Sequence, residues 1–192
     1  MSYNPENELQ KIVLKYPNQK WDWFSLSQNP NITMNMIFNN LELSWNWIGV
    51  SRNPNLTLDI IKKYPNIKWN IYCVYKNPNI TLYDILELQE IYYINWIGIA
   101  YNPNLTTSFI EQNINKICLF GLSSNEALDF SLVDKYADHN WHWIFLSNNP
   151  NLKLSVVLNN PEKNWSWRTI PSNSGVSMND IRDTLETNNK LV

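Results

Sequence analysis

Hydrophobic and polar positions along the chain repeat with a period of about 24 residues, which is typical of solenoid proteins. One copy runs from Trp45 to Tyr64 and contains a Trp-x-Trp pair, an Asn-Pro-Asn-apolar-Thr segment and a second apolar run. We call the position of the second Trp the second-Trp slot. This slot falls at positions 23, 47, 71, 96, 118, 143 and 167, so the successive steps are 24, 24, 25, 22, 25 and 24.

Each repeat is predicted to contain two short helices joined by the Asn-Pro-Asn segment. The first helix is expected to begin at the Trp pair, with the preceding residue (Ser44, Asn140 or Asn164) as its N-cap. It must end before the proline, because a residue that precedes proline disfavours the α region. The N-caps expected for the second helix are Thr33, Thr57, Thr81 and Thr106. No alternating pattern of a strand persists anywhere, which favours an all-α chain.

The second helix carries an apolar stripe with helical spacing, as in Leu58, Ile61 and Tyr64. The residues expected in the same core slot as Ile61 are Ile37, Ile85, Ile110, Leu132, Val157 and Ile181. The tryptophans of the pairs are also expected in the core, because each holds one fixed position per repeat. These are Trp21, Trp45, Trp69, Trp141 and Trp165 as first members, and Trp23, Trp47, Trp96, Trp143 and Trp167 as second members.

The predicted fold is therefore an all-α solenoid of about seven two-helix repeats, either α/α or α/3₁₀, wound into a superhelix. We expect one domain over residues 1–192, with an N-terminal half-repeat cap at 1–20, repeats at 21–168 and a C-terminal cap at 169–192. The repeat near 115–136 is degenerate, with Cys118 in the second-Trp slot and Asn125 in the proline slot. The last repeat has Ser174 in the proline slot.

Composition agrees with a continuous core and sets limits on partners. Hydrophobic residues make up 44%, with ten Trp, whereas charged residues make up 17% and the net charge is -2, which does not favour nucleic acid. Cys73 and Cys118 are too few for a disulfide framework and are expected as small core residues in a reducing compartment. The polar N-terminus has no signal-peptide pattern, and no apolar run approaches the roughly 18 residues of a membrane span. We expect a cytoplasmic protein.

The sequence offers little for catalysis or metal binding. His139 and His142 are three residues apart, but only Asp138 lies nearby as a further ligand, so solvated side chains are the better interpretation. No carboxylate recurs beside a histidine and a nucleophile, and the four glycines are too few for a phosphate-binding loop. We therefore predict no enzymatic activity, no cofactor and no metal.

The recurring apolar-Ser-x-Asn-Pro-Asn-Leu-Thr motif, at this period, resembles the leucine-rich repeat variant family from Trp21 to about Asp183. The resemblance implies repeats that pair an α-helix with a short 3₁₀ helix in a right-handed superhelix, and it implies no catalytic residues. The chain departs from that family in its Trp-x-Trp pair and in lacking a second proline after the threonine. The Asn-rich Trp-x-Trp version also resembles repeat proteins of giant DNA viruses of amoebae, which implies a viral source, in the host cytoplasm or the virion.

Side chains vary between repeats at three slots of the first helix: between the two tryptophans, two residues after the second and five residues after it. Slots three apart line one helix face, and stacking would turn them into a binding surface. The residues expected to contact a partner are Gln28, Arg52, Lys76, Tyr101, Phe145 and Asn148. The predicted function is a non-enzymatic scaffold that binds a host or viral protein. The alternative is a single-stranded nucleic-acid binder that uses exposed Trp. The oligomeric state is left open, a homodimer included.

Overall fold

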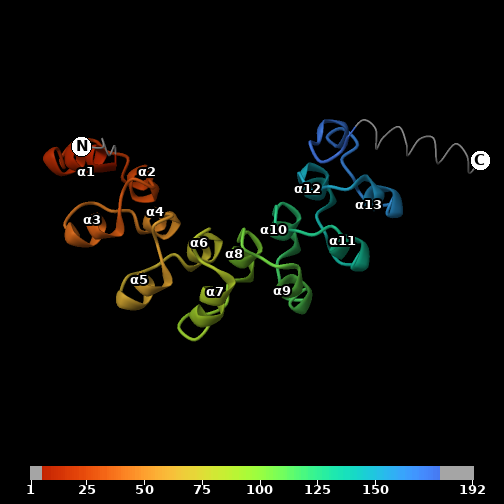
Figure 1. Cartoon of the computed structure of the whole chain (residues 1–192), viewed down its shortest axis with the longest axis horizontal. Coiled ribbons are helices and arrows are strands. Elements are labelled where there is room, and N and C mark those ends of the chain that lie inside the picture. Colours follow the sequence, from red (N-terminus) through yellow and green to blue (C-terminus); the bar gives the residue numbers. More distant parts are fainter. Residues whose placement is uncertain (1–5, 178–192) are drawn as a thin grey trace, which may run out of the picture. The chain divides into compact units, whose positions relative to one another are not determined.

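A computed structural model describes residues 6–177, and within them it contains thirteen α-helices, one 3₁₀ helix and no strand. The chain begins with α1 (Glu6–Lys15) (Figure 1). The first helices of the repeats are α2 (Trp23–Gln28), α4 (Trp47–Arg52), α6 (Ile71–Lys76), α8 (Trp96–Ala100), α10 (Leu119–Ser123), α12 (Trp143–Asn148) and η1 (Ile170–Ser172). The second helices are α3 (Met34–Asn39), α5 (Leu58–Lys63), α7 (Leu82–Leu88), α9 (Thr107–Gln112), α11 (Ser131–Lys135) and α13 (Leu154–Asn159).

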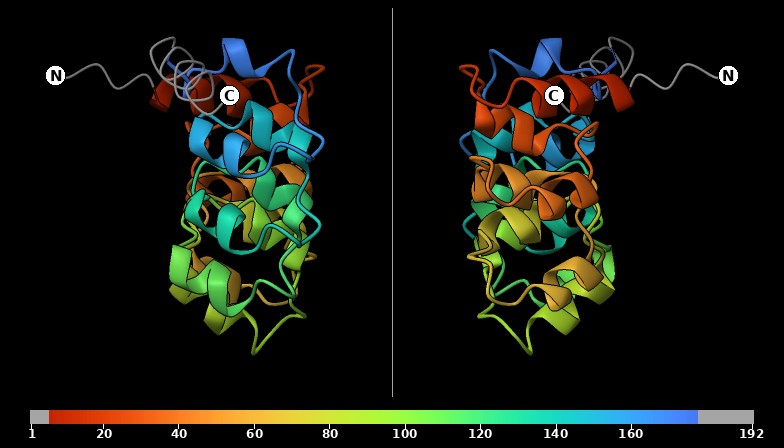
Figure 2. Two further views of the ribbon diagram at one scale, coloured as in Figure 1. Left: turned by 90° about the vertical axis from the view of Figure 1, so that its right-hand side faces the viewer. Right: turned by 90° about the vertical axis from the view of Figure 1, so that its left-hand side faces the viewer.

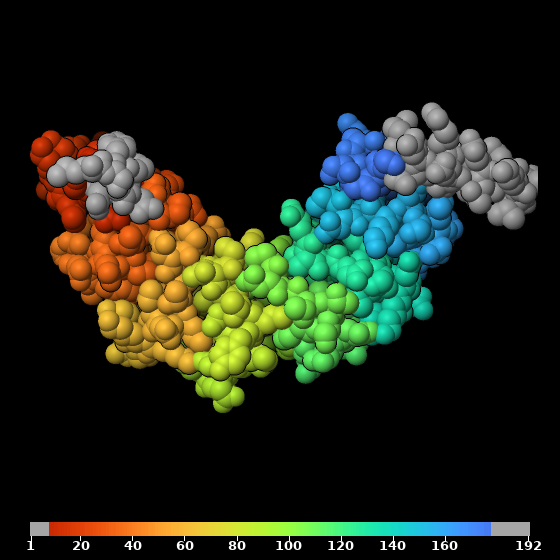
Figure 3. Space-filling view, in the orientation of Figure 1, coloured from red at the N-terminus to blue at the C-terminus, as the bar shows by residue number. Residues whose placement is uncertain are grey.

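The chain forms two compact units, an N-terminal unit (Met1–Gly98) and a C-terminal unit (Ile99–Val192), with the boundary inside α8. In the N-terminal unit α2 packs on α4 and α4 on α6, while in the C-terminal unit α10 packs on α12 and α11 on α13. Figures 2 and 3 show successive repeats of each unit lying against one another. This stacking confirms the all-α solenoid class. Both elements of a repeat are α-helices, except that the last described repeat begins with a 3₁₀ helix.

The single domain over residues 1–192 and the superhelical winding stay predictions. The predicted C-terminal cap lies largely outside the described residues, as does Ile181. Within the described part, no helix has the length and apolar character needed to cross a bilayer.

The first helix begins at the second Trp, so the N-caps predicted at Ser44, Asn140 and Asn164 are wrong. The cap is the residue between the two tryptophans. Asn46 Oδ1, for example, accepts the N–H of Gly49 at 3.0 Å, and Asp22, Asn70 and His142 cap their helices in the same way. The backbone N–H of Asn46 also donates to Ser27 Oγ of the preceding repeat at 2.9 Å. This contact between repeats holds Asn46 in extended backbone, so the helix begins only at Trp47.

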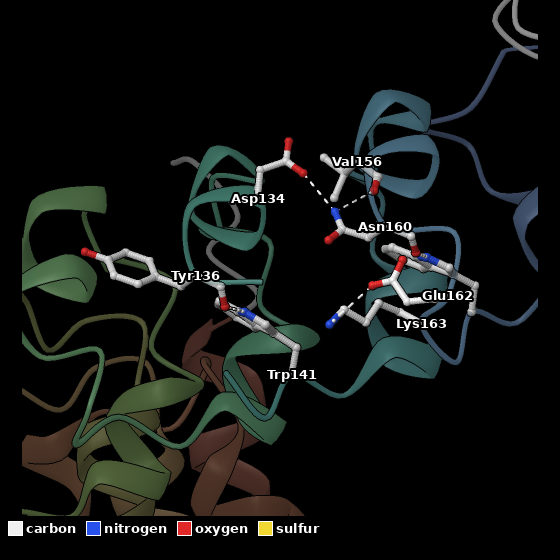
Figure 4. Close-up of polar contacts among 8 residues, drawn as sticks. Asp134, Tyr136, Trp141, Val156, Asn160, Glu162 and Lys163 are labelled. Atoms are coloured by element: carbon white, nitrogen blue, oxygen red, sulfur yellow. Dashed lines mark hydrogen bonds and ion pairs between the residues drawn. The ribbon is translucent and has the colours of Figure 1, made fainter. Parts of the chain in front are cut away.

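The two tryptophans of a pair have different roles. The first members Trp45, Trp69, Trp141 and Trp165 are buried, with 5 to 7% of their surface exposed. Their indole N–H donates to the carbonyl five residues earlier, at the C-terminus of the preceding second helix, as from Trp141 to Tyr136 at 2.9 Å (Figure 4). The second members are only half-buried, as is the first member Trp21, and Trp167 is 62% exposed. The prediction that they are core residues is therefore wrong for Trp167 and holds only in part for the others. Trp23, Trp47 and Trp143 each pack edge-on against the next first member, as Trp143 does on Trp165 with 4.9 Å between ring centroids.

The degenerate repeat keeps the regular geometry in a register that differs by one position from the predicted one. Helix α10 starts at Leu119, so Leu119 holds the second-Trp slot and Cys118 is the N-cap. Asn125 therefore holds the first Asn of Asn-Pro-Asn rather than the proline slot. The step from Trp96 to Leu119 becomes 23, and the step from Leu119 to Trp143 becomes 24. The missing Trp and Pro had obscured this register in the sequence.

The first asparagine of each Asn-Pro-Asn segment forms what we call the asparagine ladder. Its members are Asn29, Asn53, Asn77, Asn102, Asn125, Asn149 and Asn173. In Asn77, Nδ2 donates to the carbonyls of Ser51 (3.1 Å) and Asn53 (2.9 Å), and Oδ1 accepts the N–H of Asn79 (2.9 Å). Asn149 repeats this pattern with Ser123, Asn125 and Asn151. Because buried amides must be satisfied, the ladder fixes successive turns on one another within each unit.

The second helices match the sequence prediction closely. The residues in the Ile61 slot of the described repeats are at most 3% exposed: Ile37, Ile61, Ile85, Ile110, Leu132 and Val157. Thr33, Thr57, Thr81 and Thr106 each accept a backbone N–H three residues later, which confirms them as N-caps. Lys153 holds this position in the sixth repeat and forms no side-chain cap.

Candidate functional site

The three slots of the predicted variable surface have different surroundings. At Asp22, Asn46, Asn70 and His142 the slot between the tryptophans caps the first helix, so the side chain is committed to the backbone. The slot two residues after the second Trp is buried at Gly49, Cys73, Gly98 and Gly121. A Cβ on Gly49 would lie 2.7 Å from the carbonyl oxygen of Phe24 and 2.8 Å from Ser27 Cβ. At Gly49 the neighbouring first helices therefore approach too closely for any side chain.

The slot five residues after the second Trp faces outward. Arg52, Lys76 and Asn148 are exposed, and Gln28 and Tyr101 are half-buried. In the degenerate repeat the corrected register puts exposed Ser124 in this slot. This is the part of the predicted stripe that varies freely at the surface.

Phe145 occupies the inner slot yet remains half-buried within an aromatic cluster of the C-terminal unit. Its ring lies 4.6 Å from the Phe120 ring and 4.2 Å from the His142 ring, between centroids. His142 accepts the Phe145 N–H at Nδ1, which fixes the cluster on the first turn of α12. Among the predicted contact residues, Phe145 is therefore held by aromatic packing.

An exposed apolar slot, which the sequence did not predict, lies directly after the second Trp. Its most exposed members are Ile48 (45%), Ile97 (55%), Phe120 (48%) and Ile144 (51%). This slot lies four residues before the outward slot and thus on the same helix face. The sequence shows that the slot is apolar in every first helix from Phe24 to Ile144, but not that it is exposed.

Equivalent slots line one hollow in each unit. The N-terminal hollow, about 250 Å³, is lined by Arg52, Cys73, Lys76, Asn77 and Pro78. The C-terminal hollow, about 240 Å³, is lined by Ser124, Glu126, Phe145, Asn148, Asn149 and Pro150. Each hollow lies between the outward slots of two successive repeats and ends at an asparagine of the ladder and its proline. Four of the six predicted contact residues thus line a hollow, while Gln28 and Tyr101 line neither.

Charges are arranged differently on the two kinds of helix. On the second helices, Lys62 pairs with Glu87 and Lys135 with Glu111, each across neighbouring repeats. The hydrogen bond from Lys62 lowers the pKa of Glu87, and that from Lys135 lowers the pKa of Glu111. On the first helices, Arg52 instead stacks on the Phe24 ring, 5.4 Å from its centroid, and its Nε donates to Cys73 Sγ at 3.4 Å.

The described residues hold no group of three or more potential metal ligands. A hollow of about 500 Å³ lies beside Asp138 and His139, but its remaining lining is Ile114, Asn115, Ile117, Leu119, Phe120 and Asn140. His139 Nε2 lies 3.3 Å from Asn115 Oδ1, a contact between neighbouring repeats. This hollow brings together no nucleophile and base, so its chemistry is that of a polar surface.

Comparison of the chain with models of protein families, with curated proteins and with solved structures gives no match. The resemblance to leucine-rich repeat variant proteins and the viral source therefore stay predictions that rest on the repeat motif.

Proposed function

We propose that this protein is a non-enzymatic repeat scaffold that binds another protein through the exposed face of its first helices. We call this face, in each unit, the binding face. It consists of the apolar slot after the second Trp and the outward slot four residues later, together with the hollows between them. If the resemblance to viral repeat proteins holds, the partner is a protein of the host or the virus.

The observation that carries the proposal is the recurrence of one hollow with different side chains. The asparagine and proline at its end are the same in both units, whereas Arg52 and Lys76 give way to Ser124 and Asn148. A scaffold with fixed backbone and variable outward side chains is the arrangement that repeat proteins use for recognition. Exposed apolar residues such as Ile48 and Ile144 supply the area that binding requires.

No observation favours the alternative of single-stranded nucleic-acid binding. Base stacking needs open aromatic faces, but four first-member tryptophans are buried and hydrogen-bonded. Trp23, Trp47 and Trp143 pack against three of them, and Trp167 alone among the described tryptophans has most of its surface exposed. The first helices α2, α4, α6, α8, α10 and α12 contribute two cations, Arg52 and Lys76, to meet phosphates.

Affinity capture from expressing cells, with the purified full chain as bait, tests the proposal. The face variant combines Ile48→Gln, Arg52→Gln, Lys76→Gln and Ile144→Gln. The control variant makes the same kinds of change away from the binding face: Lys20→Gln, Lys68→Gln, Leu86→Gln and Leu158→Gln. All eight side chains are exposed, so both variants should fold.

We expect one or more proteins to be captured by the wild type and by the control variant, and to be lost with the face variant. Capture that is equal with both variants would place the interface elsewhere. Recovery of nucleic acid alone would contradict the proposal.

A further inference from the structure

We infer that the N-terminal hollow binds an acidic peptide segment of the partner, with an Asp or Glu carboxylate held between Arg52 and Lys76. This inference rests on the proposed function and names the chemistry that one part of the binding face recognises. The two cations line the same hollow from successive repeats, one at the end of α4 and one at the end of α6.

The charge on this surface is one-sided. Arg52 and Lys76 are the charged residues within α2, α4, α6 and the turns at 53–57 and 77–81. Arg52 forms no ion pair with any carboxylate in the described part of the chain. The second helices of the same unit differ, because Lys62 there has its own partner in Glu87. Between the second helices Lys62 is thus neutralised by a carboxylate, whereas between the first helices Arg52 is exposed to solvent without one.

The guanidinium of Arg52 is held in place before any ligand arrives. It stacks on Phe24 of the preceding repeat, and its Nε donates to Cys73 of the following repeat. The two Nη nitrogens form no hydrogen bond to the described residues, which leaves them for a ligand. A planar guanidinium with paired donors matches a carboxylate in a bidentate geometry, and prior ordering reduces the entropy lost on binding.

Apolar side chains flank both cations. Ile48, 45% exposed, lies four residues before Arg52 on the same helix face, and the half-buried Tyr72 lies four residues before Lys76. A ligand that combines a carboxylate with a neighbouring apolar side chain matches this alternation. A nucleic acid matches it less well, because its phosphates would need more cations than two, and the next charge toward the N-terminus, Asp22, is negative.

The C-terminal hollow provides an internal comparison. It has the same position in the repeat but contains Glu126 and no cation. An acidic segment should therefore not bind there, and the specificity should depend on the outward slots rather than on the repeat geometry.

The test is selection of short random peptides, displayed on phage, against the immobilised full chain, followed by fluorescence anisotropy with the recovered peptides. We expect recovered peptides to contain Asp or Glu beside an apolar residue. Their affinity should fall at least about tenfold for Arg52→Gln/Lys76→Gln, as loss of charge-assisted hydrogen bonds implies. The matched variant Lys20→Gln/Lys68→Gln should leave it unchanged. Arg52→Lys should weaken binding partially, because it keeps the charge but not the paired donors.

Two results would overturn the inference while leaving the proposed function in place. One is recovery of neutral or basic peptides, and the other is binding that resists Arg52→Gln/Lys76→Gln but is lost on Ile144→Gln. Failure to recover any peptide would also overturn it, and the capture experiment would then decide the proposed function separately. A single-stranded oligothymidylate that binds the wild type and not Arg52→Gln/Lys76→Gln would assign the hollow to nucleic acid instead.

Discussion

The hollows of the two units are built on the same backbone arrangement, which we call the frame, but their charged side chains have opposite sign. Each is lined by outward slots of two successive repeats and ends at a ladder asparagine, Asn77 or Asn149. Two cations line the N-terminal hollow, whereas a carboxylate and an aromatic ring line the C-terminal one. The frame comes from buried hydrogen bonds that recur, and the chemistry from side chains that make none of those bonds. The chain can therefore change what it binds without changing how it folds.

The shared frame depends most on the first-member tryptophans. Trp69→Ala and Trp141→Ala should each reduce the free energy of unfolding by about 3 to 5 kcal/mol, as for a buried large side chain. Trp69→Phe and Trp141→Phe keep an aromatic ring but lose the hydrogen bond from the indole N–H to a carbonyl at a helix C-terminus. Each should therefore reduce the free energy of unfolding by about 1 kcal/mol. Urea unfolding followed by circular dichroism measures both. Trp167→Ala, at an exposed ring, is the control, and a cost equal to that of Trp69→Ala would contradict this assignment.

The asparagine ladder should contribute equally in the two units. Asn77→Ala and Asn149→Ala each remove two bonds to buried carbonyls and one from a turn N–H. Unsatisfied buried groups should then destabilise each variant by about 2 to 4 kcal/mol, measured by urea unfolding. Asn35→Ala, on the exposed surface of α3, should have little effect. Costs for Asn77→Ala and Asn149→Ala that differ by more than about 1 kcal/mol would show that the frames are not equivalent.

The glycines between neighbouring first helices should distinguish the two units. A Cβ on Gly49 meets backbone and the Ser27 Cβ at under 3.0 Å, so Gly49→Ala should destabilise by about 1 to 3 kcal/mol. A Cβ on Gly121 meets the Tyr101 ring at 2.9 Å and the Ala100 Cβ at 3.0 Å, but no backbone oxygen. Since alanine favours a helix over glycine by about 1 kcal/mol, Gly121→Ala should cost less than Gly49→Ala. Thermal unfolding of the two variants checks this order, and equal losses would contradict it.

The ion pairs of the second helices should give the smallest effect. The folded pKa of Glu87 is lowered by Lys62, and that of Glu111 by Lys135, so each contributes stability above the unfolded pKa of about 4.3. This contribution is lost as the pH falls through the lowered folded pKa. Lys62→Met and Lys135→Met should therefore each reduce, by similar small amounts, the loss in the free energy of unfolding that occurs as the pH falls through the acid range. Urea midpoints across the acid range measure it, and an unchanged slope in both variants would exclude a stabilising role.

Some residues of the candidate binding face could be predicted from the sequence, but which slots of the first helix are buried and which are exposed could not. The outward position of Arg52, Lys76 and Asn148 follows from their spacing after the second Trp. The burial of the slot at Gly49 and Cys73 does not, because it depends on how closely two helices of different repeats approach. The exposed position of Ile48 and Ile144 was likewise hidden, since an apolar residue on a short helix is interpreted as core from sequence.

The sequence by itself determined the repeat, the two-helix unit, the stop at Asn-Pro and the threonine N-caps, because these follow from local backbone preferences and helical periodicity. Tertiary structure alone decided where the first helix begins, which tryptophan of a pair is buried, and the register of the degenerate repeat. Each of these depends on a bond that crosses between elements: Ser27 to Asn46, Trp45 to the end of α3, and Asn125 to Asn102. Two of these partners lie about one repeat away in the sequence, and the third is set by where α3 ends, so the local sequence of the Trp pair does not identify them.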